Sequence, residues 1–246
     1  MEITSMQKST HLARCTLTGA DDTTAHDWLF ETGARYPFVE WGILYSDSQQ
    51  GAGRYPSYEW LRVLLQRMRR TPRQFGFALH ICGRAVQDFI EDHGVAAEIS
   101  KDFGRIQLNL HASRVDLQRL AKAIRQRSHQ TIIVQFNKEN ASLPQALAGL
   151  GNHAFLFDTS GGRGLAPEFW PTPLEDSSCG YAGGLGLHNL AQELPKIHHV
   201  ANGNYWIDME GRLRDSADCF DTAVAQQVLP VVEDFRRQHN TEAANP

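Results

Sequence analysis

An aspartate and a glycine-rich segment follow one apolar run of this sequence. Residues 154–158 read AFLFD, and Gly161, Gly162 and Gly164 come soon after Asp158. A carboxyl group at the end of a buried strand is partly shielded from water, which suits it to general acid catalysis. Glycines let the backbone turn tightly and direct N–H groups at an anion. The segment predicts a catalytic acid beside an anion site, with a structural carboxylate and a plain turn as the alternative.

A second glycine-rich segment has the same character. Residues 180–189 read GYAGGLGLHN, in which Gly183 and Gly184 leave an apolar run and a helix is expected to begin near Leu187 or His188. The N-terminus of a helix attracts anions, and barrel proteins often bind phosphate there. We therefore expect the two glycine segments to form one anion site.

The elements that must position these residues alternate along the chain. Apolar runs typical of strands occur at 11–16, 39–46, 75–81, 105–110, 131–136, 154–158, 180–184 and 205–209. Helical patterns lie between most of them, including 21–32, 57–70 and a last helix over 217–238. Eight strands alternating with helices over 246 residues predict a single-domain α/β fold, the (β/α)8 TIM barrel, spanning 1–246 with an N-terminal extension at 1–10. An open doubly wound sheet is the alternative.

A barrel places active groups where its strands end. Every predicted strand ends in polar or glycine residues, namely Cys15, Ser46, His80 and Cys82, Asn109 and His111, Asn137, Asp158, Gly183 and Gly184, and Asp208 and Glu210. Because loops are polar in any case, this pattern indicates where a site would lie and not what it does.

Composition narrows the function classes. The chain carries 24 basic and 28 acidic residues, a balance that gives no reason to expect a nucleic-acid or membrane partner. No apolar run is long enough for a transmembrane helix, and the N-terminus lacks the apolar core of a secretory signal. The 4 cysteines are widely spaced, which favours reduced thiols and a cytoplasmic location.

Six of these segments together, in order, form a pattern. They are Cys15-Thr16-Leu17-Thr18, Arg54-Tyr55-Pro56, Ile106-Gln107-Leu108, Asp158 with its glycines and Phe169-Trp170, Ala182-Gly183-Gly184-Leu185, and Ile207-Asp208-Met209. The chain resembles, from about residue 11 onwards, phosphoribosylanthranilate isomerase of tryptophan biosynthesis.

The resemblance implies an enzyme that performs an Amadori rearrangement, an aldose–ketose isomerisation of a phosphorylated amino sugar. Asp158 would be the general acid that protonates the ribose ring oxygen, and Cys15 the general base. Arg54 would bind the anthranilate carboxylate. Further substrate-binding residues would be Gln107, Gly161, Gly162, Gly164, Gly183, Gly184 and Asp208. The resemblance implies no cofactor and no metal; the partner would be a small phosphorylated molecule, and a homodimer is left open.

Three positions depart from the family pattern. Thr16 replaces a glycine, His80-Ile81-Cys82 replaces a Phe-Val-Asn ending, and Met209-Glu210-Gly211-Arg212 replaces a Ser-Ser-Gly phosphate loop. Glu210 would repel a phosphate unless Arg163 or Arg212 pairs with it. The roles of His80, Cys82 and His111 are left open. Two function classes remain. The first is an isomerase or a related sugar-phosphate enzyme. The second is a barrel that has lost the reaction and binds a metabolite or partner, or that acts on a non-phosphorylated substrate.

Overall fold

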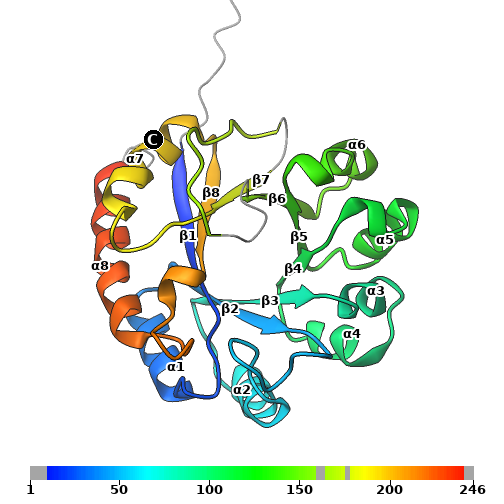
Figure 1. Ribbon diagram of the computed structural model, residues 1–246, viewed down its shortest axis with the longest axis horizontal. Coiled ribbons are helices and arrows are strands. Elements are labelled where there is room, and N and C mark those ends of the chain that lie inside the picture. Colours follow the sequence, from blue (N-terminus) through cyan, green and yellow to red (C-terminus); the bar gives the residue numbers. More distant parts are fainter. Residues whose placement is uncertain (1–9, 159–163, 175–177, 241–246) are drawn as a thin grey trace, which may run out of the picture.

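Eight parallel strands form a closed barrel in the computed structural model, which describes residues 10–158, 164–174 and 178–240. Each strand pairs with the next along the chain, and β8 closes the barrel against β1 (Figure 1). The strands are β1 (His11–Thr18), β2 (Val39–Tyr45), β3 (Gly76–Cys82), β4 (Arg105–Asn109), β5 (Thr131–Phe136), β6 (His153–Asp158), β7 (Ser178–Ala182) and β8 (Asn204–Met209). The predicted (β/α)8 barrel is confirmed, and the open doubly wound sheet is excluded.

Helices surround the barrel (Figure 1). They are α1 (His26–Arg35), α2 (Tyr58–Arg70), α3 (Ala85–Ile90), α4 (Gly94–Ser100), α5 (Leu117–Gln126), α6 (Leu143–Leu147), α7 (Leu190–Val200) and α8 (Thr222–His239). Their apolar faces pack with the outward-facing strand residues into one large core. None of these helices is long and apolar enough to cross a membrane.

Two helices begin later than the sequence pattern indicates. Asp21, the first residue of the expected helix 21–32, instead accepts hydrogen bonds from the backbone N–H and hydroxyl of Thr23, which forms a turn before α1. The last helix begins after Asp221, whose carboxylate accepts from the N–H groups of Ala223 and Val224. The side chain of Asp221 thus caps α8, whereas Ala25, the N-cap residue of α1, makes no side-chain hydrogen bond.

The interior of the barrel is unusually polar below the strand ends. Glu40 is 1% exposed and its carboxylate lies 2.9 Å from Nε of Arg105 and accepts from the Thr16 hydroxyl. The Arg105 guanidinium also stacks on the Trp206 ring, 4.4 Å from its centroid. A buried charge requires such pairing because removing it from water is costly. This charged cluster fills the barrel beneath the strand ends together with Ile133 and Leu156, which pack with Trp206.

Gly180 makes room for this filling. A Cβ at Gly180 would lie 2.0 Å from Cε2 of Trp206, so any larger residue must displace the indole. We expect Gly180→Ala to lower the free energy of unfolding by about 1–3 kcal/mol, as overpacking does. Urea denaturation measures this. Gly151→Ala is the matched control, because nothing lies within 4 Å of its Cβ position and the expected change is below about 1 kcal/mol. Equal effects of the two substitutions would contradict the clash.

Candidate active site

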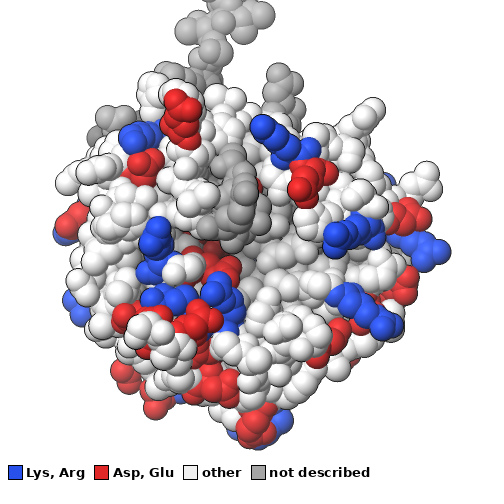
Figure 2. Space-filling view, viewed as in Figure 1, with Lys and Arg blue, Asp and Glu red and all other residues white. Residues whose placement is uncertain are grey.

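A pocket of about 500 Å³ opens at the carboxyl ends of the strands. Figure 2 shows a hollow in this face, with acidic atoms in its depth and basic side chains beside it. Seven of the residues that sequence reasoning selected lie in its wall: Arg54, Gln107, Asp158, Gly164, Gly183, Gly184 and Asp208. Their common location makes them one site, whereas their individual roles remain predictions.

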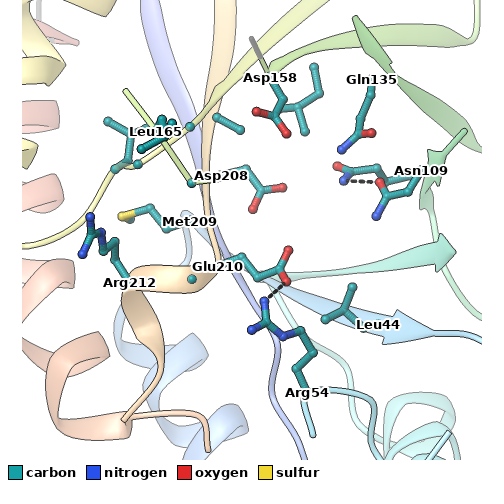
Figure 3. A pocket seen from close by; sticks show the side chains of 18 of the residues that line it. Leu44, Arg54, Asn109, Gln135, Asp158, Leu165, Asp208, Met209, Glu210 and Arg212 are labelled. Atoms are coloured by element: carbon teal, nitrogen blue, oxygen red, sulfur yellow. Dashed lines mark hydrogen bonds and ion pairs between the residues drawn. The ribbon is translucent and has the colours of Figure 1, made fainter. Parts of the chain in front are cut away.

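Asp158 and Asp208 lie near each other in the same wall of the pocket (Figure 3). In the strand register Asp158 pairs with Ala182 and Ala182 pairs with Asp208, so the two carboxylates extend from the same level two strands apart. That spacing separates the backbones by about 9–10 Å. Both side chains point into the pocket (Figure 3), and both residues are nearly buried, at 5% and 6% exposed. A small polar molecule can therefore lie between two carboxyl groups.

The two carboxyl groups are not equivalent. Burial raises the pKa of Asp208 well above its usual value, although the Thr18 hydroxyl donates a hydrogen bond of 2.8 Å to its Oδ1. The nearby carboxylates Glu210, Glu40 and Asp158 raise this pKa further. A raised pKa of this kind is typical of carboxyl groups that take part in acid–base catalysis.

Glu210 forms an ion pair with Arg54. Nη1 of Arg54 lies 2.6 Å from Glu210 Oε1, and its Nη2 lies 3.1 Å from Asp218. The expected partner of Glu210 was Arg163, which lies outside the described residues, or Arg212, which lies on the other side of Met209 (Figure 3). Arg54 is the partner because the fold brings the β2–α2 and β8–α8 loops together, although they are far apart in sequence. Arg54 is therefore already neutralised before a substrate carboxylate arrives.

A row of carboxamides forms the opposite wall. Gln107 donates from Nε2 to Oδ1 of Asn109, and Asn109 donates from Nδ2 to Sγ of Cys82 at 3.1 Å. Tyr55 also hydrogen bonds to this sulfur. Burial raises the pKa of the Cys82 thiol, so the thiol is neutral at physiological pH. Oε1 of Gln107 is buried and has no partner in the described part of the chain, which leaves an acceptor for a ligand hydroxyl or amine.

Cys15, which the sequence predicts as the catalytic base, is not among the residues that line this pocket. The sequence pattern ended the first strand at residue 16, but β1 continues to Thr18. Thr16 and Thr18 point into the barrel, where they hydrogen bond to Glu40 and Asp208. Successive strand residues face opposite sides, so Cys15 faces the helices, where it is fully buried in the outer core. Burial raises the pKa of its thiol far above the usual value, which disfavours the thiolate that a base would require.

A substitution tests this placement. We expect Cys15→Ala to lower the free energy of unfolding by about 1 kcal/mol through a small cavity. It should leave turnover within about twofold, because the thiol makes no contact that differs between substrate and transition state. Thermal unfolding and the assay described below provide the two measurements. A loss of turnover in a variant that unfolds at an unchanged temperature would show that Cys15 takes part in the reaction.

The glycines of the two loops contact each other. A Cβ at Gly184 would lie 2.5 Å from the backbone nitrogen of Ala166, and one at Gly183 would lie 2.8 Å from the carbonyl oxygen of Leu165. Both glycines also adopt positive φ. Close approach of the β6–β7 connection thus requires glycine at these two positions. Gly161 and Gly162 lie outside the described residues.

The rim beyond these glycines is the basic part of the pocket. Arg212 lines it, and its Cβ lies 2.7 Å from a Cβ built on Gly186. Asn189 accepts from the N–H of Gly186 and precedes α7. A helix N-terminus and a guanidinium at one edge suit an anionic group. Within the described residues no group of three or more His, Cys, Asp or Glu is placed to hold a metal ion.

The sequence assigned no role to several residues of the pocket wall. Cys82, Asn109 and Tyr55 all line the pocket. Their positions indicated this, because Cys82 and Asn109 end strands and Tyr55 follows Arg54, whereas their residue types did not. Gln135 also lines the pocket, and strand alternation could have placed it there. His111, by contrast, is exposed and lies 2.6 Å from Glu139, away from the pocket wall.

Comparison with known proteins supports the fold. No protein-family model matches the chain, and no curated protein matches its sequence. The phosphoribosylanthranilate isomerase of Thermus thermophilus has a TM-score of 0.62 and 15% identity, over 91% of this chain and 100% of that one. The Thermotoga maritima enzyme has a TM-score of 0.58 and 14% identity, over 91% and 100%. TrpF from Jonesia denitrificans has a TM-score of 0.60 and 14% identity, over 89% and 96%. The chain therefore has the barrel fold of proteins that its strand-end motifs resemble.

Proposed function

We propose that this protein is a cytoplasmic isomerase that shifts a carbonyl group between adjacent carbons of a small phosphorylated amino sugar. The observation that carries the proposal is the pair Asp158 and Asp208, level with each other in a nearly buried pocket. An aldose–ketose isomerisation needs one group to give a proton to oxygen and another to take a proton from carbon. The phosphoribosylanthranilate isomerases with the same fold support this reaction class.

Asp158 is assigned as the acid, as the sequence motif implies, and Asp208 replaces Cys15 as the base. Asp158 protonates the ring oxygen of the sugar and opens the ring. Asp208 then removes the proton from the adjacent carbon, and the enol-type product tautomerises to the ketose. When Asp208 accepts this proton it changes from a charged to a neutral group, which its burial favours.

The ends of the substrate are assigned by charge and hydrogen bonding. The rim of Gly184, Gly186 and Arg212 suits the phosphate group. The carboxamides Gln107 and Asn109 suit hydroxyl or amine groups on the other side. Because Arg54 is paired with Glu210, a carboxylate-bearing substrate must compete for this arginine.

The direct test is a panel of phosphorylated aldoses and amino sugars, with phosphoribosylanthranilate as the first member, together with rescue of a tryptophan auxotroph that lacks the isomerase. Turnover that is lost in Asp158→Asn and Asp208→Asn supports the proposal. Binding of phosphorylated sugars without turnover of any member would instead favour a barrel that has lost the reaction.

Glu210 decides whether the pocket can bind phosphate. Because Arg54 neutralises its carboxylate, we expect Glu210→Ser to change the affinity for inorganic phosphate by less than tenfold, about 1.4 kcal/mol. Isothermal titration measures this. A gain of tenfold or more would show that Glu210 repels phosphate, and a non-phosphorylated substrate would then be the better assignment.

A further inference from the structure

His80 is a buried histidine that the proposed reaction does not yet use. It lies on β3 in the barrel interior, is 1% exposed, and its Nε2 has no hydrogen-bond partner among the described residues. Leaving such an atom unpaired is energetically unfavourable. Nε2 lies 3.9 Å from Oδ2 of Asp208, the carboxylate in the pocket wall. An unpaired ring nitrogen therefore lies beside a group proposed to exchange protons.

Among the described residues, no arginine or lysine lies at ion-pair distance from Asp208. Its Oδ1 accepts from Thr18, so Oδ2 is the oxygen that faces His80. The arginines nearby are engaged elsewhere, Arg105 with Glu40 at 2.9 Å and Arg54 with Glu210 at 2.6 Å. Within the described residues, His80 is the group at ion-pair distance from Asp208.

We propose that His80 and Asp208 share one proton and act as a single acid–base unit at the bottom of the pocket. When Oδ2 of Asp208 and Nε2 of His80 approach from 3.9 Å to hydrogen-bond distance, the proton leaves Oδ2 and binds Nε2 as the carboxylate becomes a base, and it returns by the same route. A carboxylic acid and a neutral imidazole are thus exchanged for a carboxylate and an imidazolium, with no change in electron count. His80 is then a positioning residue that acts through Asp208; its part in catalysis rests on the proposed isomerase function.

The physical reason is that neither charge is stable alone in this place. Burial raises the pKa of Asp208, and burial together with Arg105 lowers the pKa of His80 to about 3. Forming both charges together recovers part of the cost, because opposite charges attract strongly at low dielectric. The two groups then titrate as a pair. The other titratable and charged groups that bear on them are Glu40 on β2, Arg105 on β4, Asp158 on β6 and Glu210 after β8.

Nuclear magnetic resonance of the full-length protein tests the shared proton. With labelled His80 ring nitrogens and Asp208 Cγ, we expect both signals to follow the same two midpoints between about pH 4 and about pH 9. Between the midpoints, the Nε2 signal should lie between the neutral and imidazolium values. His153, the first residue of β6, whose Nδ1 bonds the Leu150 carbonyl, is the internal reference. A fully neutral His80 signal throughout the titration of Asp208 would overturn the proposal.

Substitution of either partner gives the second test. In His80→Gln we expect the ionised fraction of Asp208 in the one-proton range to fall at least about tenfold, which is one pKa unit. An unchanged Cγ signal in the folded variant would overturn the proposal. If His80→Gln does not fold, Asp208→Asn decides: its His80 must lose the intermediate signal, and an unchanged His80 signal overturns the proposal. No substrate is needed, so a failure of the isomerase function would appear separately, as absent turnover with the shared titration intact.

Discussion

Asp158→Asn is expected to lower kcat by a factor of about 10²–10⁴, the usual contribution of a general acid. The substitution keeps the size of the side chain and its place at the end of β6, but it removes the transferable proton. Substrate affinity should change little, because an amide can still hydrogen bond to the sugar. The measurement is steady-state turnover of the best substrate from the panel.

The control for Asp158→Asn is a carboxylate outside the pocket. Asp234 is exposed on α8 and pairs with Arg237, so Asp234→Asn removes the same charge without altering the site. We expect its kcat to equal that of the natural protein. Equal activity of Asp158→Asn and Asp234→Asn would exclude Asp158 as the acid, whatever the substrate.

Asp208→Asn is expected to abolish most turnover and at the same time to stabilise the protein. The folded-state pKa of this carboxyl group is raised, mainly by burial. At a pH below the pKa that Asp208 has in the unfolded chain, its carboxyl group is protonated in both the folded and the unfolded state. The group then does not lower the free energy of unfolding. As pH rises from that value through the folded-state pKa, the unfolded state releases its proton more readily and the folded state loses stability. Asparagine removes this penalty and can still accept the Thr18 hydrogen bond.

The gain at neutral pH should be at least about 1 kcal/mol, since one pKa unit corresponds to about 1.4 kcal/mol. For a domain of this size it appears as a rise in melting temperature of about 2–4 °C. The gain should shrink as the pH falls towards about 4, where both carboxyl groups are protonated. A variant that is less stable than the natural protein at pH 7 would show that Asp208 serves the fold rather than the reaction. Stability gained with activity lost is the expected sign of a catalytic group.

Much of the architecture was predictable because it depends on local patterns. Short apolar runs alternate with amphipathic helices, and that alternation alone favours a parallel barrel. The strand β5 was predicted with the observed bounds, 131–136. Asp158 and Asp208 were predicted as site residues because they end or nearly end their strands, and the C-terminal face of a barrel collects such residues.

The tertiary structure was needed to decide which side of the sheet each strand residue faces and which residues far apart in the sequence come into contact. Cys15 and Thr16 are neighbours, yet one faces the helices and the other the barrel interior. A shift of one residue exchanges the two faces, and a register shift between Leu12 and Arg14 lies in this strand. Motif spacing alone could not resolve that choice.

Contacts across the barrel were beyond the sequence for a different reason. Arg54 and Glu210 are 156 residues apart, and His80 and Asp208 come from strands on different parts of the barrel wall. Local propensity determines which residues end strands, but not which side chains then meet inside the closed barrel. The sequence by itself therefore determined the barrel and the positions of its acids, whereas closure of the barrel decided which charges are neutralised and which can exchange protons.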